Sequence, residues 1–121
     1  MKDSNIIVAK SFQFALKIIE LYKDLRFKQK EFILSGQILK SGTSIGANIE
    51  EAIGGISRKD FAAKISIAYK EARETRYWLK LMIMSEVIDM PKYEHLMKDC
   101  HEINKILAAI LLTLKKNQSV Q

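Results

Sequence analysis

The feature that most constrains this fold is an apolar stripe that continues through a stretch poor in helix-forming residues. Residues 41–52, SGTSIGANIEEA, place two glycines, two serines, a threonine and an asparagine ahead of two glutamates. A P-loop would end in Gly-Lys-Ser/Thr after a strand, and that pattern is absent. Residues 42–46, GTSIG, do have the order Gly-x-Ser-x-Gly, but no catalytic histidine is nearby and no strand precedes them, so a nucleophile elbow is not favoured. At about 100° per residue, the apolar positions fall on one face and predict a helix. They are Leu34, Ile38, Ile45, Ile49 and Ala52, with Ile53 at the edge.

Two further sides of this helix carry distinct residue types. Ser35, Gly42 and Gly46 share one side, and each of the two glycines costs about 1 kcal/mol relative to alanine, so we expect another helix to approach closely there. A polar row on the other side is either a ligand or metal site, or a hydrogen-bonded seam that fixes helix pairing. We favour the seam, because polar side chains in a half-buried row usually need only hydrogen bonds to one another or to the backbone. The row contains Gln37, Ser41, Ser44, Asn48 and Glu51.

Apolar spacing and punctuation predict four helices in a single domain spanning residues 1–121. Strand signals are scarce, and the connections are short, so the expected fold is an all-α, antiparallel up-down-up-down four-helix bundle. The predicted helices are approximately Ser4–Leu25, Lys30–Ile53, Ser57–Val87 and Asp89–Lys116.

Local signals mark the starts of the last two helices. Ser57 is placed as an N-cap with Asp60 three residues later, and Ile56 is placed to pack onto Phe61 as a hydrophobic staple. Pro91 falls in the first turn of the fourth helix, where its missing N–H costs little.

Composition limits the compartment and the partner. The single cysteine, Cys100, allows neither an intramolecular disulfide nor a thiolate metal cluster, which suits a reducing cytoplasm. Lys10 and Lys17 interrupt the N-terminal apolar runs, so the sequence shows no signal-peptide core, and no later window approaches a membrane span. The net charge of +6 points weakly to an anionic partner.

No catalytic or metal site is expected. Carboxylate-bridged iron in four-helix bundles draws on Glu-x-x-His pairs, whereas this chain offers only Glu71-x-x-Glu74, and its histidines, His95 and His101, are six residues apart. Cys100 and His101 are adjacent, and adjacent helical residues do not face each other. With no set of nucleophile, base and oxyanion donors, the sequence indicates a protein that is not an enzyme and needs no cofactor.

The third predicted helix carries a basic stripe within about a third of its circumference. Tyr69 and Tyr77 lie in the same sector, and basic residues interleaved with tyrosines suit nucleic-acid phosphates and bases. The alternative is a solvated face with Lys70–Glu74 and Asp60–Lys64 pairs, and the sequence leaves both open. The stripe consists of Arg58, Lys59, Lys70, Arg73, Arg76 and Lys80.

The first predicted helix has more apolar surface than one bundle core needs. One face carries Ile7, Phe14, Ile18, Leu21 and Leu25, and the polar sector of Lys10, Gln13, Lys17, Glu20 and Asp24 is narrow. The second apolar face implies a partner surface; oligomerisation is the economical explanation, and a bound lipid or hydrophobic cofactor is the alternative. This second face consists of Val8, Phe12, Ala15, Leu16 and Ile19.

Two segments carry a resemblance to a known family: EFILSGQILKSGTSIGANIEEA (31–52) and AYKEARETRYWLKLM (68–82). They resemble the bacterial four-helix bundle family encoded in intervening sequences of 23S ribosomal RNA genes, which includes the accessory variability determinant of diversity-generating retroelements. The resemblance implies a ring-like homopentamer with a basic surface. For the retroelement member it implies binding to a reverse transcriptase and to nucleic acid.

The residues that match the family motif are interpreted as signature residues of the fold. We expect Asn48 and Glu51 to meet polar groups of the third helix, while Glu71, Glu74 and Trp78 share one side of it. Lys40 stands where relatives often have arginine, which would weaken a bidentate contact. The matching positions are Ser41, Gly42, Thr43, Ser44, Ile45, Asn48, Ile49, Glu51, Glu71, Glu74, Thr75, Tyr77, Trp78 and Leu79.

Two function classes follow from the sequence. The first is an oligomer that binds structured RNA or DNA through the basic stripe. The second is a protein-interaction scaffold, such as an accessory subunit of a retroelement reverse transcriptase, in which the basic charge is secondary.

Overall fold

The structure is all α-helical, as the sequence predicts. The computed structural model describes the backbone of residues 2–120 and the side chains of residues 5–117. This part of the chain forms four α-helices and one short π-helical segment, and it contains no strand. The elements are α1 (Lys2–Lys23), the π-helix η1 (Asp24–Lys28), α2 (Leu34–Ile53), α3 (Arg58–Met84) and α4 (Met90–Val120).

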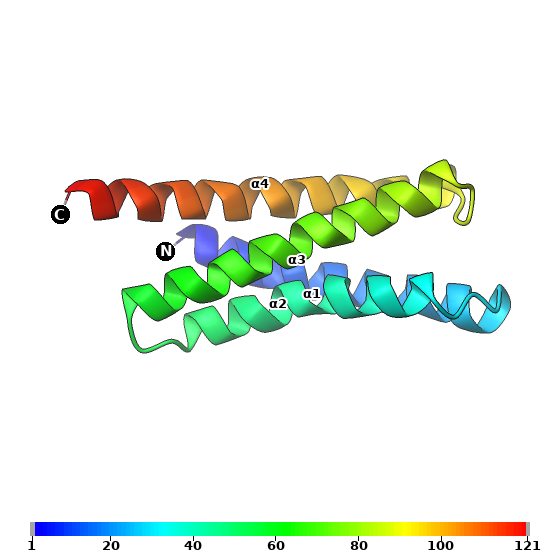
Figure 1. Cartoon of the computed structure of the whole chain (residues 1–121), viewed down its shortest axis with the longest axis horizontal. Helices are drawn as coiled ribbons and strands as arrows, with labels where there is room; N and C mark the ends of the chain where they lie inside the picture. The colour runs from blue at the N-terminus through cyan, green and yellow to red at the C-terminus, as the bar shows by residue number, and fades with distance from the viewer. Residues whose placement is uncertain (1, 121) are drawn as a thin grey trace.

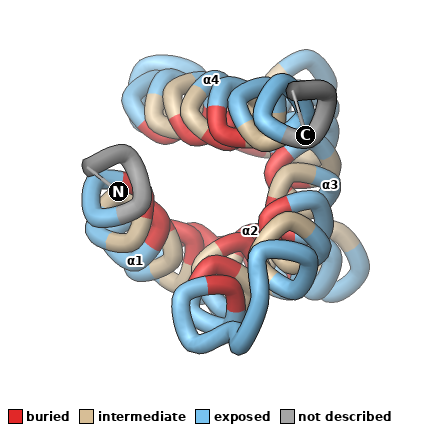
Figure 2. Tube along the Cα trace, turned by 90° about the vertical axis from the view of Figure 1, so that its left-hand side faces the viewer, coloured by how far each residue is buried: buried red, intermediate tan, exposed pale blue. Residues whose placement is uncertain are grey.

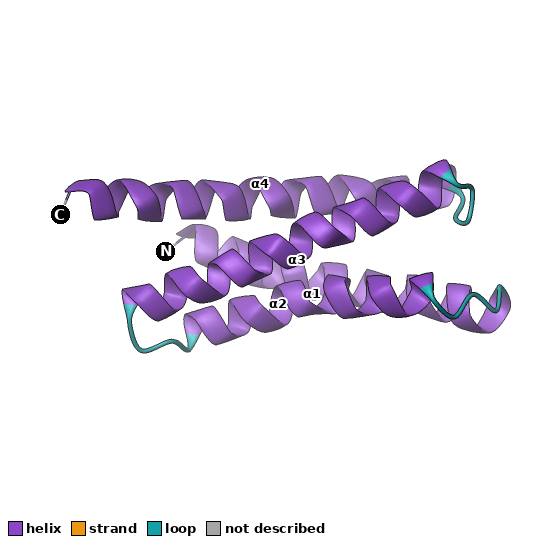
Figure 3. Ribbon diagram, in the orientation of Figure 1, coloured by secondary structure: helices purple, strands orange, loops and turns teal. Residues whose placement is uncertain are grey.

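The helices lie side by side as long rods (Figure 1). The α1–α2 and α3–α4 connections are at one end, and the α2–α3 connection is at the other (Figure 3). On α1 and α2 the facing residues follow opposite order, because Ser11 lies beside Gly46 and Ile18 beside Gly42. Viewed end-on, the buried positions of all four helices face a shared interior (Figure 2).

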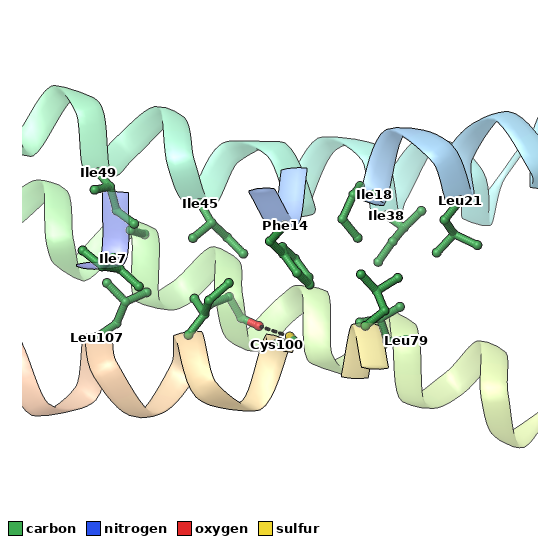
Figure 4. Packing of buried hydrophobic residues seen from close by; sticks show 14 of the residues in the cluster. Ile7, Phe14, Ile18, Leu21, Ile38, Ile45, Ile49, Leu79, Cys100 and Leu107 are labelled. Carbon is green, nitrogen blue, oxygen red and sulfur yellow. Dashed lines mark hydrogen bonds between the residues drawn. The ribbon is translucent and has the colours of Figure 1, made fainter. Parts of the chain in front are cut away.

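The interior is filled mainly by aliphatic side chains (Figure 4). The predicted stripe on α2 is confirmed, since Ile38, Ile45 and Ile49 are fully buried and Ala52 is nearly so. Burial of one such aliphatic side chain contributes roughly 1.5–3 kcal/mol. The labelled core residues are Ile7, Phe14, Ile18, Leu21, Ile38, Ile45, Ile49, Leu79, Cys100 and Leu107.

α1 packs on the side of α2 that carries almost no side chains. A Cβ atom at Gly42 would lie 2.8 Å from both Cγ1 and Cγ2 of Ile18, which is too close for carbon atoms that are not bonded. At Gly46 the nearest atom would be Ser11 Oγ at 3.4 Å. The predicted close approach is therefore confirmed, and it is tightest at Gly42.

The contact between α1 and α4 is the least extensive of the neighbouring pairs, and it includes two ion pairs. Lys10 Nζ lies 2.7 Å from Glu102 Oε2, and Lys17 Nζ lies 2.7 Å from Asp99 Oδ2. These pairs are partly exposed, so each stabilises the fold by at most about 1 kcal/mol. A cavity of about 290 Å³ is lined by residues of both helices, including Phe14. The narrow polar sector of α1 thus contains residues that face α4.

The start of the second helix differs from the expectation. α2 begins at Leu34 rather than near Lys30. Lys30 has a φ of 57°, in the left-handed region, which interrupts a right-handed helix. The Glu31 carboxylate then accepts hydrogen bonds from the backbone N–H groups of Leu34 at 3.0 Å and Ser35 at 2.7 Å, and so caps the new helix. The first helix also continues beyond Leu25, as the π-helix η1.

The start of α3 agrees with the sequence in its cap and differs in its staple. Ser57 Oγ accepts a hydrogen bond from the Asp60 N–H at 3.1 Å, as predicted. The expected staple of Ile56 onto Phe61 is wrong, because Ile56 is 97% exposed. The turn that follows Gly54-Gly55 points Ile56 into solvent, a direction that the spacing of residues does not encode. α3 ends at Met84, before the predicted Val87, and Pro91 lies in the first turn of α4 as expected.

The second apolar face predicted on α1 is present and largely open. Phe12 is 61% exposed and Leu16 is 46% exposed, while Val8, Ala15 and Ile19 are half-buried. No helix within residues 2–120 combines the length and the apolar character that crossing a membrane requires.

Alanine substitutions at two glycines of α2 test the close approach of α1. Gly36→Ala places its methyl group in open space, since no atom lies within 4 Å of the position. It should raise the free energy of unfolding by up to about 1 kcal/mol through helix propensity. Gly42→Ala forces Ile18 to move, and we expect a net loss of about 1–2 kcal/mol by overpacking. Urea denaturation measures both, and equal stabilisation by the two variants would contradict the close packing.

Candidate functional site

The six residues of the predicted basic stripe all lie on α3 with exposed side chains. Within residues 5–117, no carboxylate forms an ion pair with any of them. The helix displays the stripe on one side because its opposite side is buried through Ile65, Ala68, Ala72, Thr75 and Leu79. The stripe consists of Arg58, Lys59, Lys70, Arg73, Arg76 and Lys80.

Aromatic rings accompany the stripe. The Arg73 guanidinium carbon lies 5.7 Å from the centre of the Tyr69 ring, and Arg73 Nη1 donates to Tyr69 Oη at 3.3 Å. Tyr77 is 58% exposed and meets Trp78 edge-on, with ring centres 5.1 Å apart. The stripe therefore combines free cations with tyrosines that are partly exposed.

The ion pairs expected for a merely solvated face do not form. Lys64 Nζ lies 3.4 Å from Glu51 Oε1 on α2 instead of pairing with Asp60. Glu74 accepts a hydrogen bond from Trp78 Nε1 at 3.3 Å instead of pairing with Lys70. The two ion pairs that would indicate a merely solvated face are therefore absent from the described residues.

Several family-motif residues lie where α2 and α3 meet. Thr75 and Ser41 are both buried, and their hydroxyl oxygens are 3.0 Å apart. Thr75 Oγ1 also lies 2.8 Å from the Glu71 carbonyl oxygen, which can only accept. One hydroxyl hydrogen cannot serve both contacts, so Thr75 donates to Glu71 and accepts from Ser41. This is a buried, satisfied polar link between α2 and α3.

The polar row continues along the same seam. Glu51 meets Lys64 of α3, as expected, but the Asn48 amide donates to the Ser44 carbonyl of its own helix at 2.8 Å. The expectation that Asn48 contacts a polar group of α3 is therefore wrong for its amide N–H, which instead donates to a carbonyl oxygen one turn earlier on α2. Burial raises the pKa of Glu71, and the neighbouring Glu74 carboxylate adds to the rise. The row has the hydrogen bonding of a structural seam.

Cys100 and His101 do not form a reactive pair. Burial raises the pKa of the Cys100 thiol to about 12, so the thiol stays protonated at neutral pH. Its Sγ lies 3.7 Å from the Ala72 carbonyl oxygen, which also accepts from Asn104 Nδ2 at 3.1 Å. His101 is exposed on another side of α4. In the described residues, no group of three or more histidine, cysteine or acidic side chains is arranged to hold a metal ion.

One exposed feature was not singled out from the sequence. The α1–α2 connection carries Phe27 and Phe32 around Arg26, at 66% and 57% exposure for the two rings. The sequence does contain an indication of this feature, because both phenylalanines lie in the basic segment RFKQKEF (26–32). The sequence predicted that the second helix begins near Lys30, so it did not predict the turn that brings the two rings together.

Comparisons with known proteins give one family. A family model described as 23S rRNA-intervening sequence protein matches residues 3–109. A crystal structure of a protein of unknown function from the S23 ribosomal protein family of Bacteroides thetaiotaomicron is 52% identical, with a TM-score of 0.86. The match covers 90% of this chain and 97% of that one. No curated protein matches.

A double-mutant cycle tests the buried link between α2 and α3. Thr75→Val alone should lower the free energy of unfolding by about 1–3 kcal/mol, because it leaves the Ser41 hydroxyl buried without its partner. The double variant Ser41→Ala with Thr75→Val should lose clearly less than the sum of the two single losses. Ser66→Ala removes an exposed hydroxyl that bonds only within α3, and it should change stability by less than about 0.5 kcal/mol. Strictly additive losses in urea denaturation would rule out a coupled pair.

Proposed function

This chain belongs to the 23S rRNA-intervening sequence protein family, and from that premise we propose that it is a non-enzymatic protein that binds nucleic acid. Structured RNA or duplex DNA is held by the basic stripe of α3. The observation that carries the proposal is that six exposed cations on one helix form no ion pair with a carboxylate within residues 5–117. Such cations release condensed counterions when they meet phosphates, and this favours binding.

The arrangement of the stripe favours phosphate contacts over base reading. Its cations lie between Arg58 and Lys80 on α3, which at about 1.5 Å per residue spans roughly 33 Å. A row of this length can follow a nucleic-acid backbone. Contacts of Lys and Arg with phosphates position a protein on the nucleic acid but do not distinguish one base from another. Binding of this kind is strongly salt-dependent and weakly sequence-dependent.

Charge reversal within the stripe tests the proposal. Arg73→Glu with Arg76→Glu should leave the denaturation midpoint unchanged, since both side chains are exposed, and should remove most of the affinity for structured RNA and duplex DNA. Wild-type affinity should fall at least about 10-fold between 50 and 200 mM salt. Fluorescence anisotropy measures both effects. Lys98→Glu with Lys105→Glu is the matched control, because it makes the same charge change at exposed positions of α4.

The outcomes separate the two function classes. If the wild type binds no nucleic acid at low salt, the stripe is a solvated face, and a scaffold role, such as an accessory subunit of a reverse transcriptase, replaces the proposal. If the wild type binds and the control pair weakens it as much as the α3 pair does, general charge carries the binding and the stripe does not.

We also propose that the protein is a homo-oligomer joined through the second apolar face of α1. The support is that Phe12 and Leu16 are large, apolar and exposed on one side of α1. The family resemblance implies a ring-like homopentamer. In such a ring each subunit would repeat the α3 stripe, so modest phosphate contacts would add through multivalency.

Size-exclusion chromatography with light scattering tests the oligomer. The wild type should elute as a multiple of the 13.9 kDa chain, and Phe12→Ser with Leu16→Ser should shift it toward the monomer without unfolding it. Leu112→Ser, at a 55% exposed position of α4, is the control that should leave the mass unchanged. A monomeric wild type at micromolar concentration would refute the oligomer.

A further inference from the structure

A cluster of exposed rings and cations lies at the α1–α2 connection, residues 22–33, here named the tip. Phe27 is 66% exposed and Phe32 is 57% exposed. The Arg26 guanidinium carbon lies 5.9 Å from the centre of the Phe27 ring and 5.1 Å from that of Phe32. Tyr22 meets Phe27 edge-on, with ring centres 6.4 Å apart. The two phenylalanine rings are thus held around one planar cation at the surface.

The backbone of the tip is held by a buried side chain and by backbone hydrogen bonds. Leu25 is fully buried, and its carbonyl oxygen accepts from the Glu31 N–H at 2.8 Å, while the Gln29 N–H donates to the Asp24 carbonyl at 3.0 Å. Lys30 takes its left-handed conformation between these bonds. The rings are therefore presented on a closed, hydrogen-bonded turn, so little ordering entropy is lost when they bind a ligand.

The charge of the tip is directed outward. Its two acidic residues are engaged: Glu31 caps α2, and Asp24 accepts from Tyr93 Oη at 2.7 Å and Lys92 Nζ at 3.1 Å on α4. Asp24 also forms an ion pair with Lys28 of the tip, at 3.3 Å. The hydrogen bonds from Tyr93 and Lys92 lower the pKa of Asp24 to about 2, so the carboxylate stays ionised at neutral pH. Among the described residues, no ion pair joins Lys23 or Lys30 to a carboxylate. The solvent-facing surface of the tip combines rings with cations.

We propose that the tip binds unpaired bases of single-stranded nucleic acid, stacked on Phe27 and Phe32, with Lys23 and Lys30 at the phosphates. The inference rests on the proposed function and deepens it by naming the form of nucleic acid. Every base offers a π-face, so rings beside cations hold single strands with little sequence preference. Paired bases are stacked inside a duplex and cannot reach the rings. The stripe on α3 does not distinguish the two forms, and the tip does.

A membrane surface fits the tip less well. Rings that insert into lipid need to leave their polar neighbours at the interface, but the Arg26 guanidinium lies between Phe27 and Phe32. Insertion of both rings would carry a guanidinium toward the hydrocarbon, which is strongly unfavourable. The same cation beside the rings suits a nucleotide, because it adds an attractive charge next to the stacked base.

The test replaces the rings in two ways. Phe27→Leu with Phe32→Leu keeps apolar surface and removes the π-faces, whereas Phe27→Tyr with Phe32→Tyr keeps them. The probes are a fluorescein-labelled, unstructured single strand and a blunt duplex of the same length, titrated by anisotropy at low salt. The leucine variant should lose at least about 5-fold of its single-strand affinity, with duplex affinity unchanged. The tyrosine variant should keep both affinities, and so should the control Ile33→Ala, at a 76% exposed apolar position of the tip.

The outcomes distinguish this inference from the function on which it rests. Wild-type binding to duplex that depends on Arg73 and Arg76, with no effect of the leucine variant on single strands, overturns the tip site and leaves the α3 stripe standing. Binding of neither probe by the wild type overturns both. Equal losses of single-strand affinity in the leucine, tyrosine and Ile33→Ala variants would show a generic apolar contact and overturn stacking. Binding to phosphatidylserine vesicles that depends on the rings, without ring-dependent binding to the single strand, would also overturn it. If the double leucine variant fails to fold, Phe32→Leu alone carries the same expectation for one ring.

Discussion

The bundle depends on the absence of a side chain at residue 42. Ile18 lies directly against the backbone of α2 there, fully buried, and any Cβ atom at that position would push α1 away. The position of α1 is set mainly on this side, because its contact with α4 is slight. The close approach of α1 to α2 at Ile18 therefore depends on one glycine. This explains why a helix interior tolerates Gly42 and Gly46 despite their cost in helix propensity.

The seams between the helices differ in chemistry, and their strengths differ accordingly. α2 and α3 share the buried hydroxyl pair of Ser41 and Thr75, and α3 and α4 share the Asn104 amide on the Ala72 carbonyl. Buried polar contacts of this kind specify one pairing, because a shifted register would leave them unsatisfied. α1 and α4 are joined by lysine–carboxylate pairs that are partly exposed and line a cavity. Such pairs stabilise a contact only weakly, so we expect this contact to separate more easily than the other two.

The contacts between helices also determine where on the surface the net charge of +6 lies. Carboxylates of several helices engage lysines of neighbouring helices, the α2 cap or an indole N–H, and none forms an ion pair with the six cations of the α3 stripe within residues 5–117. The basic excess consequently concentrates on the outer face of α3 and at the tip. The acidic residues engaged in this way are Asp24, Glu31, Glu51, Glu74, Asp99 and Glu102.

The sequence by itself determined what depends on neighbours along one helix. The apolar stripe, the Ser57 cap, the small-residue side of α2 and the sector of the basic stripe all follow from a helical period and local hydrogen bonding. The tertiary structure alone decided which partners meet. Lys64 pairs with Glu51 rather than Asp60, Ile56 points into solvent, and the rings of the tip gather around one cation. The reason is physical: periodicity fixes which side chains share a face, while contacts across helices depend on the distance, register and turn geometry that packing sets.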